Sequence, residues 1–142
     1  MTVGNLANLR RDQGRLEEAG ALHERALAGH EAALGREHPS TLATVGDLAI
    51  LRADQGRLEE AGALFERALA GKEAALGREH PSTLMTVGGL AILRADQGRL
   101  EEAGALYERA LAGQEAALGR EHPETLGTVN NLANLRELQG RD

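Results

Sequence analysis

The sequence contains no cysteine and no tryptophan, and it holds one phenylalanine and one tyrosine. The absence of cysteine excludes a disulfide scaffold, a thiolate metal site and a cysteine nucleophile. No apolar run approaches the roughly 20 residues that a membrane-spanning helix needs, and the first residues show no signal-peptide pattern. Because aromatic and apolar β-branched residues are scarce, the composition argues against a sheet-rich fold.

Basic residues are fewer than acidic residues. The sequence has 16 lysines and arginines and 22 aspartates and glutamates, and its formal net charge is −6. A protein that binds duplex nucleic acid normally carries a basic surplus or patch. We therefore expect no nucleic-acid partner and no membrane partner. Lys72 is the only lysine, and the excess of arginine, alanine and glycine is typical of a GC-rich bacterial gene or of a design based on one. We expect a cytoplasmic bacterial protein.

Leucine and alanine are abundant, with 24 leucines and 25 alanines among 142 residues, which suits helices packed closely through small side chains. The sequence also repeats itself every 42 residues, and a period of this length indicates a repeat architecture. Prolines mark the period at Pro39, Pro81 and Pro123. We predict a single array of repeats 1–42, 43–84 and 85–126, followed by a partial fourth repeat at 127–142.

Each repeat predicts two helices. In the second repeat, Pro39 suits the first turn of a helix, and apolar residues at helical spacing follow it as far as Gln55. Gly56, which tolerates a positive φ, ends this helix, and a second helix is predicted from about Leu58 to Leu76. The pattern predicts seven helices in all, as three hairpins and one final helix. Because one hairpin cannot bury its apolar face alone, the hairpins are expected to stack into a solenoid.

Small residues, a turn glycine and one aromatic stand at set places in the second repeat, namely Leu48, Ala49, Gly56, Ala61, Phe65 and Ala68. In these positions and in its length, the unit resembles the tetratricopeptide repeat (TPR), in the 42-residue variety typical of kinesin light chains. The resemblance implies an all-α fold, a right-handed superhelical α-solenoid of helix-turn-helix hairpins.

The repeats depart from that family's pattern at three positions. The usual early aromatic of the first helix is Val45 here, and the usual late aromatic is Arg52. The aromatic of the second helix is His23 in the first repeat, Phe65 in the second and Tyr107 in the third. We therefore expect a thinner interior than is usual in the family, with His23 serving as a packing residue.

Glycines also lie inside the predicted second helices, where each costs ~1 kcal/mol relative to alanine. They are Gly20, Gly29, Gly62, Gly71, Gly104 and Gly113. Two explanations stay open at this point. Either stacking between repeats offsets the cost, or the glycines permit an unusually close approach of neighbouring helices.

Polar clusters that could carry chemistry recur identically in every repeat, whereas a catalytic pair is normally unique. His38, His80 and His122 occupy one loop position, but equivalent atoms of stacked repeats lie roughly 10 Å apart, and a zinc–nitrogen bond is only ~2 Å long. We predict that these histidines help to cap the helices that follow them. No phosphate-binding or nucleophile motif is present. We predict no enzymatic activity, no cofactor and no metal.

The resemblance implies that the first helices line a concave groove in which a peptide or protein segment lies. The groove residues that it implies are Asn5, Asn8, Asp47, Ile50, Asp54, Ile92, Asp96, Asn130, Asn131 and Asn134. Several of the differences between the repeats fall at these positions, which suits either a binding surface or drift at a solvated face. The aspartates favour a basic or apolar guest, and the absence of a groove lysine argues against a clamp for a terminal carboxylate.

A second function stays open beside peptide binding. The final helix has no hairpin partner, and it carries Val129, Leu132, Leu135 and Leu138. Terminal repeats normally need a polar outer face, and an uncovered apolar end invites head-to-tail association or helix swapping. The alternative prediction is therefore a self-associating structural array that forms homo-oligomers through its terminal helices.

Overall fold

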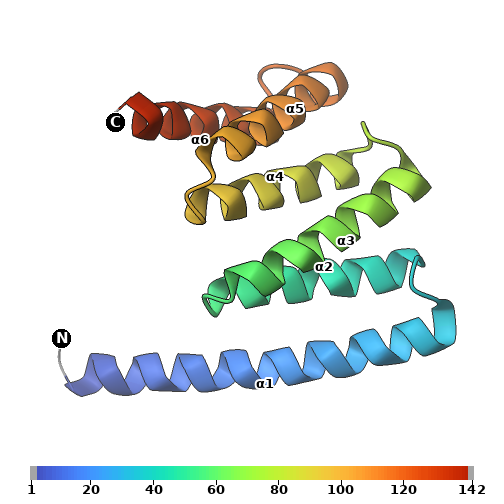
Figure 1. Cartoon of the computed structure of the whole chain (residues 1–142), viewed down its shortest axis with the longest axis vertical. Helices are drawn as coiled ribbons and strands as arrows, with labels where there is room; N and C mark the ends of the chain where they lie inside the picture. The colour runs from blue at the N-terminus through green and yellow to red at the C-terminus, as the bar shows by residue number, and fades with distance from the viewer. Residues whose placement is uncertain (1–2, 141–142) are drawn as a thin grey trace. The chain divides into compact units, whose positions relative to one another are not determined.

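The computed structural model describes residues 3–140, and it describes their side chains from Gln13 onward. These residues form six α-helices and no strand (Figure 1): α1 (Val3–Leu34), α2 (Pro39–Asp54), α3 (Leu58–Leu76), α4 (Pro81–Asp96), α5 (Leu100–Leu118) and α6 (Pro123–Gly140). The all-helical prediction is confirmed. The chain divides into two compact units, residues 1–64 and 65–142, and the division falls within α3.

The turn inside each of the two complete hairpins is built on a glycine in the left-handed region. Gly56 has a φ of 80° and Gly98 a φ of 81°, values that side chains other than glycine rarely adopt. In the first of these turns the amide of Arg57 donates to the carbonyl of Arg52 at 2.8 Å, and the amide of Gly56 donates to that of Ala53 at 3.0 Å. This pair of bonds is a Schellman motif, so the predicted glycine termination is confirmed at both turns.

The prediction of seven helices is wrong, because the first of the three predicted hairpins, whose turn would lie at Gly14 by repeat position, does not form. The helix α1 runs without interruption from Val3 to Leu34 and is one continuous ribbon in Figure 1, and Gly14 is not among the glycines with positive φ. Residues 10–16 differ from residues 52–58 only at Arg11, which replaces Ala53. The same local sequence therefore forms a turn at Gly56 and a continuous helix at Gly14.

The histidine before each first helix acts as its N-cap, as predicted. A neutral imidazole nitrogen accepts the otherwise unpaired amide of the first helical turn. The Nδ1 atoms of His38, His80 and His122 accept from the amides of Ser40 at 3.1 Å, Ser82 at 3.0 Å and Glu124 at 3.1 Å. These caps fix where α2, α4 and α6 begin.

The interior of each unit is built from leucine, valine and alanine. Val45 in the first unit and Val87 in the second are fully buried, although they replace an aromatic of the family pattern. In the second unit Ala91 of α4, Ala103 and Tyr107 of α5 and Leu135 of α6 form one buried cluster. The alanines of this cluster have no exposed surface, so these helices pack through small side chains.

Candidate functional site

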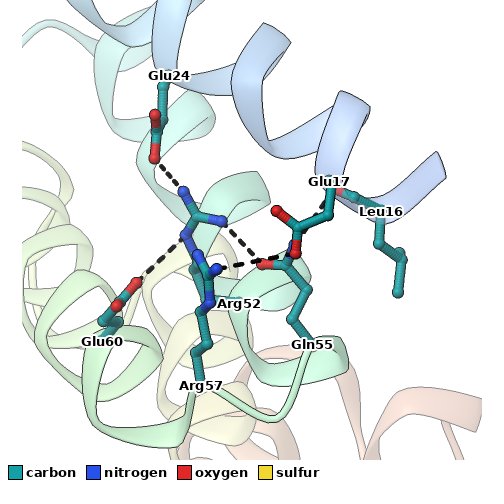
Figure 2. A network of polar contacts seen from close by, with 7 residues as sticks. All are labelled: Leu16, Glu17, Glu24, Arg52, Gln55, Arg57 and Glu60. Atoms are coloured by element: carbon teal, nitrogen blue, oxygen red, sulfur yellow. Dashed lines mark hydrogen bonds and ion pairs between the residues drawn. The ribbon is translucent and has the colours of Figure 1, made fainter. Parts of the chain in front are cut away.

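Buried arginines set the position of the first helices, which carry the predicted groove residues. Arg52 of α2 forms ion pairs with Glu24 of α1 and Glu60 of α3, and its Nη1 atom donates to Oε1 of Gln55 at 2.8 Å (Figure 2). The arginine side chain is 7% exposed, whereas the two glutamates are 59% and 60% exposed. A buried guanidinium therefore reaches carboxylates that remain hydrated, which lowers the desolvation cost of the pair.

The second unit repeats the same network. Arg94 of α4 pairs with Glu66 of α3 and, through Nε, with Oε2 of Glu102 at 3.5 Å. Its Nη1 atom donates to Oε1 of Gln97 at 2.8 Å. Arg94 stands where the family usually has the late aromatic of the first helix. It thus links α4 to α3 and α5, the helices that precede and follow it in the sequence.

Arg136 of α6 forms only part of this network. It pairs with Glu108 of α5, and its Nη1 atom donates to Oε1 of Gln139 at 2.7 Å. The position equivalent to Glu60 and Glu102 would follow the last residue of this sequence. The Arg136 side chain is accordingly 48% exposed, against 8% for Arg94.

Two of the helix glycines make room for these arginines. A Cβ atom on Gly20 would stand 2.9 Å from Nη1 of Arg52, and one on Gly104 would stand 3.1 Å from Nη1 of Arg136. At Gly113 a Cβ atom would stand 2.5 Å from Cδ1 of Leu84, whereas Gly29 has no atom within 4 Å of that place. Side chains from a neighbouring helix therefore occupy the place of a Cβ atom at Gly20, Gly104 and Gly113.

A pocket in the first unit joins three of the predicted groove residues. Asp47, Ile50 and Asp54 of α2 line a cavity of about 240 Å³ together with Leu51 and with His23 of α1. The Ile50 side chain is 54% exposed, so the pocket combines apolar surface with two carboxylates. A second cavity, of about 300 Å³, shares Asp54 and adds further polar groups from Gln13, Glu17 and Gln55.

A pocket in the second unit stands at the equivalent place, two repeats later. Residues that correspond to His23, Asp47, Ile50, Leu51 and Asp54 at a spacing of 84 are Tyr107, Asn131, Asn134, Leu135 and Leu138. All five line a cavity of about 230 Å³, together with Ile92 and Ala95 of α4. The two pockets are therefore one structural site. Its two acids are replaced by Asn131 and Leu138, its histidine by Tyr107 and its isoleucine by Asn134.

In the middle repeat an aromatic ring occupies the corresponding place. The residues equivalent to His23 and Asp47 are Phe65 and Gly89. A Cβ atom on Gly89 would stand 2.9 Å from Cε1 of Phe65, so the ring lies directly against the glycine of α4. Phe65 is 6% exposed. The same place thus has an acidic pocket in the first repeat, a buried ring against a glycine in the second and an uncharged pocket in the third.

Tyr107 keeps its proton in the neutral pocket. Burial raises the pKa of its hydroxyl above the usual value of 10.0, and the carboxylate of Asp96 on α4 raises it further. Both effects disfavour the phenolate, the first through lost hydration and the second through charge repulsion. The pocket between α4, α5 and α6 therefore contains a neutral hydroxyl, which is able to donate a hydrogen bond.

The structure places six of the ten predicted groove residues in pockets, three in each unit. Those in the first unit are Asp47, Ile50 and Asp54, and those in the second are Ile92, Asn131 and Asn134. Asp96 is exposed and close enough to Tyr107 to affect its pKa, and Asn130 is exposed and lines neither pocket. The side chains of Asn5 and Asn8 lie outside the described residues.

Sequence analysis missed the contribution of the second helices to these pockets. His23, expected only to pack, is half-buried and lines the acidic pocket, and Tyr107 lines the neutral one. A usable signal was present, because this position differs in all three repeats as the groove positions do. The expectation that Leu135 belongs to an open terminal face is wrong, since it is 2% exposed and packs against α5.

Among the residues that the structure describes, no group of three or more histidine or acidic side chains could hold a metal ion. Within the same part of the chain, no helix is sufficiently long and apolar to cross a membrane.

A family model of the tetratricopeptide repeat matches residues 1–74, 45–103 and 82–142. The chain belongs to the tetratricopeptide repeat family. Two crystal structures of kinesin light chain TPR-like repeats from Podosopora anserina, described as nearly identical repeats, share 34% identity with this TPR chain at a TM-score of 0.83. They match 96% of this chain and 64% of theirs. This agreement places the chain among the kinesin-light-chain-like TPR proteins.

The fold extends to a more distant structure. BtubC (BKLC) from P. vanneervenii has a TM-score of 0.83 at 23% identity, over 95% of this TPR chain and 54% of its own. The chain thus spans less than two thirds of the length of these solved structures. No curated protein matches the sequence.

Proposed function

We propose that this TPR chain is a non-catalytic scaffold that binds a peptide or a segment of a partner protein along its first helices. TPR proteins generally mediate protein–protein interactions, and this kind of fold is typically non-enzymatic. The observation that carries the proposal is the recurrence of one pocket, between a second helix and the following first helix, with different chemistry in different repeats. Variation at one structural place suits recognition of successive side chains of a partner.

The chemistry of the two pockets indicates the guest. Asp47 and Asp54 surround the exposed side chain of Ile50, which favours a long basic side chain with an aliphatic stem, such as arginine or lysine. In the second unit, Asn131 and Asn134 offer amides for a peptide backbone, and Ile92 offers apolar surface. We therefore propose a basic or apolar peptide, and neither nucleic acid nor a membrane, as the partner. A cytoplasmic location remains part of the proposal and rests on composition.

A peptide-library selection followed by pocket substitutions tests this proposal. Ile50→Arg and Ile92→Arg place a positive charge on the apolar surface of each pocket, which repels a basic side chain and removes apolar contact, and they should weaken selected peptides at least tenfold. Met85→Arg is the matched control, because Met85 is 64% exposed and lines neither pocket. Equal binding by the parent and by both pocket variants would overturn the proposal.

Salt dependence separates the two pockets. Binding of a basic residue beside Asp47 and Asp54 should weaken as ionic strength rises, because salt screens exposed charges. Asp47→Asn combined with Asp54→Asn should remove most of this dependence. A peptide whose affinity for the parent is insensitive to salt would contradict the basic guest at this pocket.

Self-association is a second candidate function, and a specific observation favours it. Leu126 and Val129 of α6 are 48% and 43% exposed, whereas Leu84 and Val87 at the same repeat positions are 2% and 0% exposed. We propose that this uncovered face is a contact between chains. Sedimentation velocity over a wide concentration range tests it, since a chain that stays monomeric throughout would contradict the candidate.

A further inference from the structure

The pocket of the second unit contains a buried hydroxyl group without a hydrogen-bond partner. Tyr107 is 5% exposed, and it lines the cavity of about 230 Å³ between α4, α5 and α6. Among the described residues its hydroxyl forms no hydrogen bond, yet it is not one of their fully buried unpaired atoms. The oxygen therefore reaches accessible surface, and the pocket gives access to it. Buried polar side chains normally have a partner, so an unpaired hydroxyl at a cavity points to a ligand.

The other walls of this pocket are apolar or carry amides. They are formed by Ile92, Ala95, Asn131, Asn134, Leu135 and Leu138. No carboxylate lines the pocket, because Asn131 and Leu138 hold the positions of Asp47 and Asp54 in the acidic pocket. Pockets that bind whole small molecules measure roughly 300–1,000 Å³. A cavity of about 230 Å³ therefore suits one side chain of a peptide.

Charged side chains do not suit this pocket. The pKa of Tyr107 is raised first by burial and then by the carboxylate of Asp96, and a glutamate in the pocket would meet the same lost hydration and the same repulsion. Asp96 is not part of the walls, so a lysine or arginine would lose hydration without gaining a carboxylate inside the pocket. The guest side chain is therefore uncharged.

The hydroxyl decides between uncharged guests. A leucine or methionine would take water from the Tyr107 oxygen without supplying a partner, and a buried polar group left unpaired is costly. A glutamine combines an apolar stem with a carboxamide, whose oxygen accepts from the hydroxyl and whose nitrogen donates to the side-chain oxygen of half-buried Asn131. Asn134 is exposed, and it remains available for the peptide backbone.

We infer that the pocket of the second unit holds a glutamine side chain of the bound peptide, and that the Tyr107 hydroxyl donates a hydrogen bond to its carboxamide oxygen. The inference rests on the proposed function above, and it names the residue that this pocket selects. Tyr107 is then the specificity-determining residue here, as Asp47 and Asp54 are in the acidic pocket. A peptide that occupies both pockets carries a basic residue for the first and a glutamine for the second.

The middle repeat supplies the matched variant for a test. Phe65 stands at the position of Tyr107 in that repeat, and it is 6% exposed, so the fold accommodates a phenyl ring at this position. Tyr107→Phe removes only the hydroxyl and keeps the ring. It therefore separates hydrogen bonding from packing, and circular dichroism establishes that the variant is folded.

Parallel selections from one phage-displayed library of random peptides test the preference. The parent should enrich glutamine at one peptide position. Tyr107→Phe should enrich leucine or methionine there and keep the preference for a basic residue elsewhere in the peptide. Asp54→Asn, the control in the first unit, should weaken the basic preference and keep the glutamine. Enrichment of lysine or glutamate at that position by the parent, or of glutamine by Tyr107→Phe to the same extent, would overturn the inference.

Affinities of matched peptides measure the hydrogen bond itself. Replacing the glutamine of a selected peptide by methionine should weaken binding to the parent about tenfold and binding to Tyr107→Phe less than about threefold. Replacement by glutamate should also weaken binding to the parent, and Asp96→Asn should recover part of that loss. If methionine weakens binding to the parent and to Tyr107→Phe equally, the hydroxyl is not the group that recognises glutamine.

Tyr107 also reports on the contact directly, because it is the only tyrosine. In a chain with isotopically labelled tyrosine, NMR shows the ring of this residue alone. The glutamine peptide should shift the signal of the ring carbon that bears the hydroxyl, and the methionine peptide should shift it less. Met85→Arg, which lies outside the pocket, should leave this response unchanged. Equal shifts with the two peptides would contradict the hydrogen bond.

These experiments separate the inference from the proposed function. Selected peptides that Ile92→Arg weakens, but that show no preference for glutamine, remove the inference and leave the peptide-binding scaffold standing. A parent that enriches no peptide removes both.

Discussion

The ring of Phe65 lies against the backbone of Gly89, at a place where a Cβ atom would stand 2.9 Å from Cε1 of the ring. In the first repeat the equivalent pair is His23 and Asp47, and there a cavity of about 240 Å³ is open. The two repeats thus differ at this place by a phenyl ring that lies against a glycine and an imidazole that lines a pocket with an aspartate.

Truncation of the side chain at the repeat position of His23 and Phe65 should lower the free energy of unfolding by different amounts in the first and second repeats. Phe65→Ala removes a ring that is 6% exposed and should lower the free energy of unfolding by about 3–5 kcal/mol. His23→Ala removes a half-buried side chain that borders solvent, so its cost should be under about 1 kcal/mol. Chemical denaturation monitored by circular dichroism measures both. Equal costs would contradict the difference in packing.

Substitution by alanine should change the stability of the chain in opposite directions at two glycines that share one repeat position. Gly29→Ala meets no atom within 4 Å, so the gain in helix propensity should stabilise the chain by about 1 kcal/mol. Gly113→Ala places a Cβ atom 2.5 Å from Cδ1 of Leu84, and this overpacking should destabilise the chain by about 1–3 kcal/mol. Thermal denaturation at dilute concentration, where chains are separate, measures both. Stabilisation by both substitutions would show that Leu84 moves aside at little cost.

Much of the fold is predictable from the sequence because its determinants are local. Pro39 and its equivalents begin helices, Gly56 and Gly98 end them, and the histidine caps act on amides two residues later. Gly14 has nearly the same neighbours as Gly56, yet it lies within α1. Local sequence therefore does not decide whether the turn forms. Contacts beyond the local sequence must therefore differ between the two places.

The candidate site was predictable only in part, for the same reason. Helical spacing predicts that residues such as Asp47, Ile50 and Asp54 lie on one face of the same helix. The contribution of His23 depends on which face of α1 meets α2, and spacing within a helix does not contain that information. Arg52 illustrates the point most clearly, since its partners Glu24 and Glu60 come from two other helices. Comparison of the repeats with one another would have found the variable second-helix position.

The arginine networks should contribute more to stability than surface ion pairs do. Arg52→Ala removes a 7%-exposed guanidinium with two carboxylate partners and one amide partner, and it should lower the free energy of unfolding by about 2–3 kcal/mol. Arg36→Ala is the control, because that side chain is 67% exposed in its pair with Glu31, and its cost should be under about 1 kcal/mol. Denaturant titration of both variants measures the difference. Equal losses would mean that burial adds nothing to the network.

The last prediction concerns the ionisation of Tyr107, whose pKa lies above the usual 10.0 because of burial and then because of Asp96. In the unfolded chain both causes are absent, so the unfolded state loses this proton at a lower pH than the folded state does. The folded state therefore binds more protons in the interval between the two pKa values. Stability should be unaffected by this group below about pH 10 and should fall as the pH rises through the folded pKa.

Tyr107 is the only tyrosine, so phenolate absorbance reports on this group alone. The folded chain should form phenolate at a higher pH than the chain in denaturant. Asp96→Asn should move the folded titration part of the way down, whereas Asp54→Asn in the first unit should leave it unchanged. Tyr107→Phe should lose less stability than the parent over the same alkaline range. A folded chain that forms phenolate at or below the pH of the denatured chain would contradict the burial of this hydroxyl, and with it the view of the second pocket as neutral.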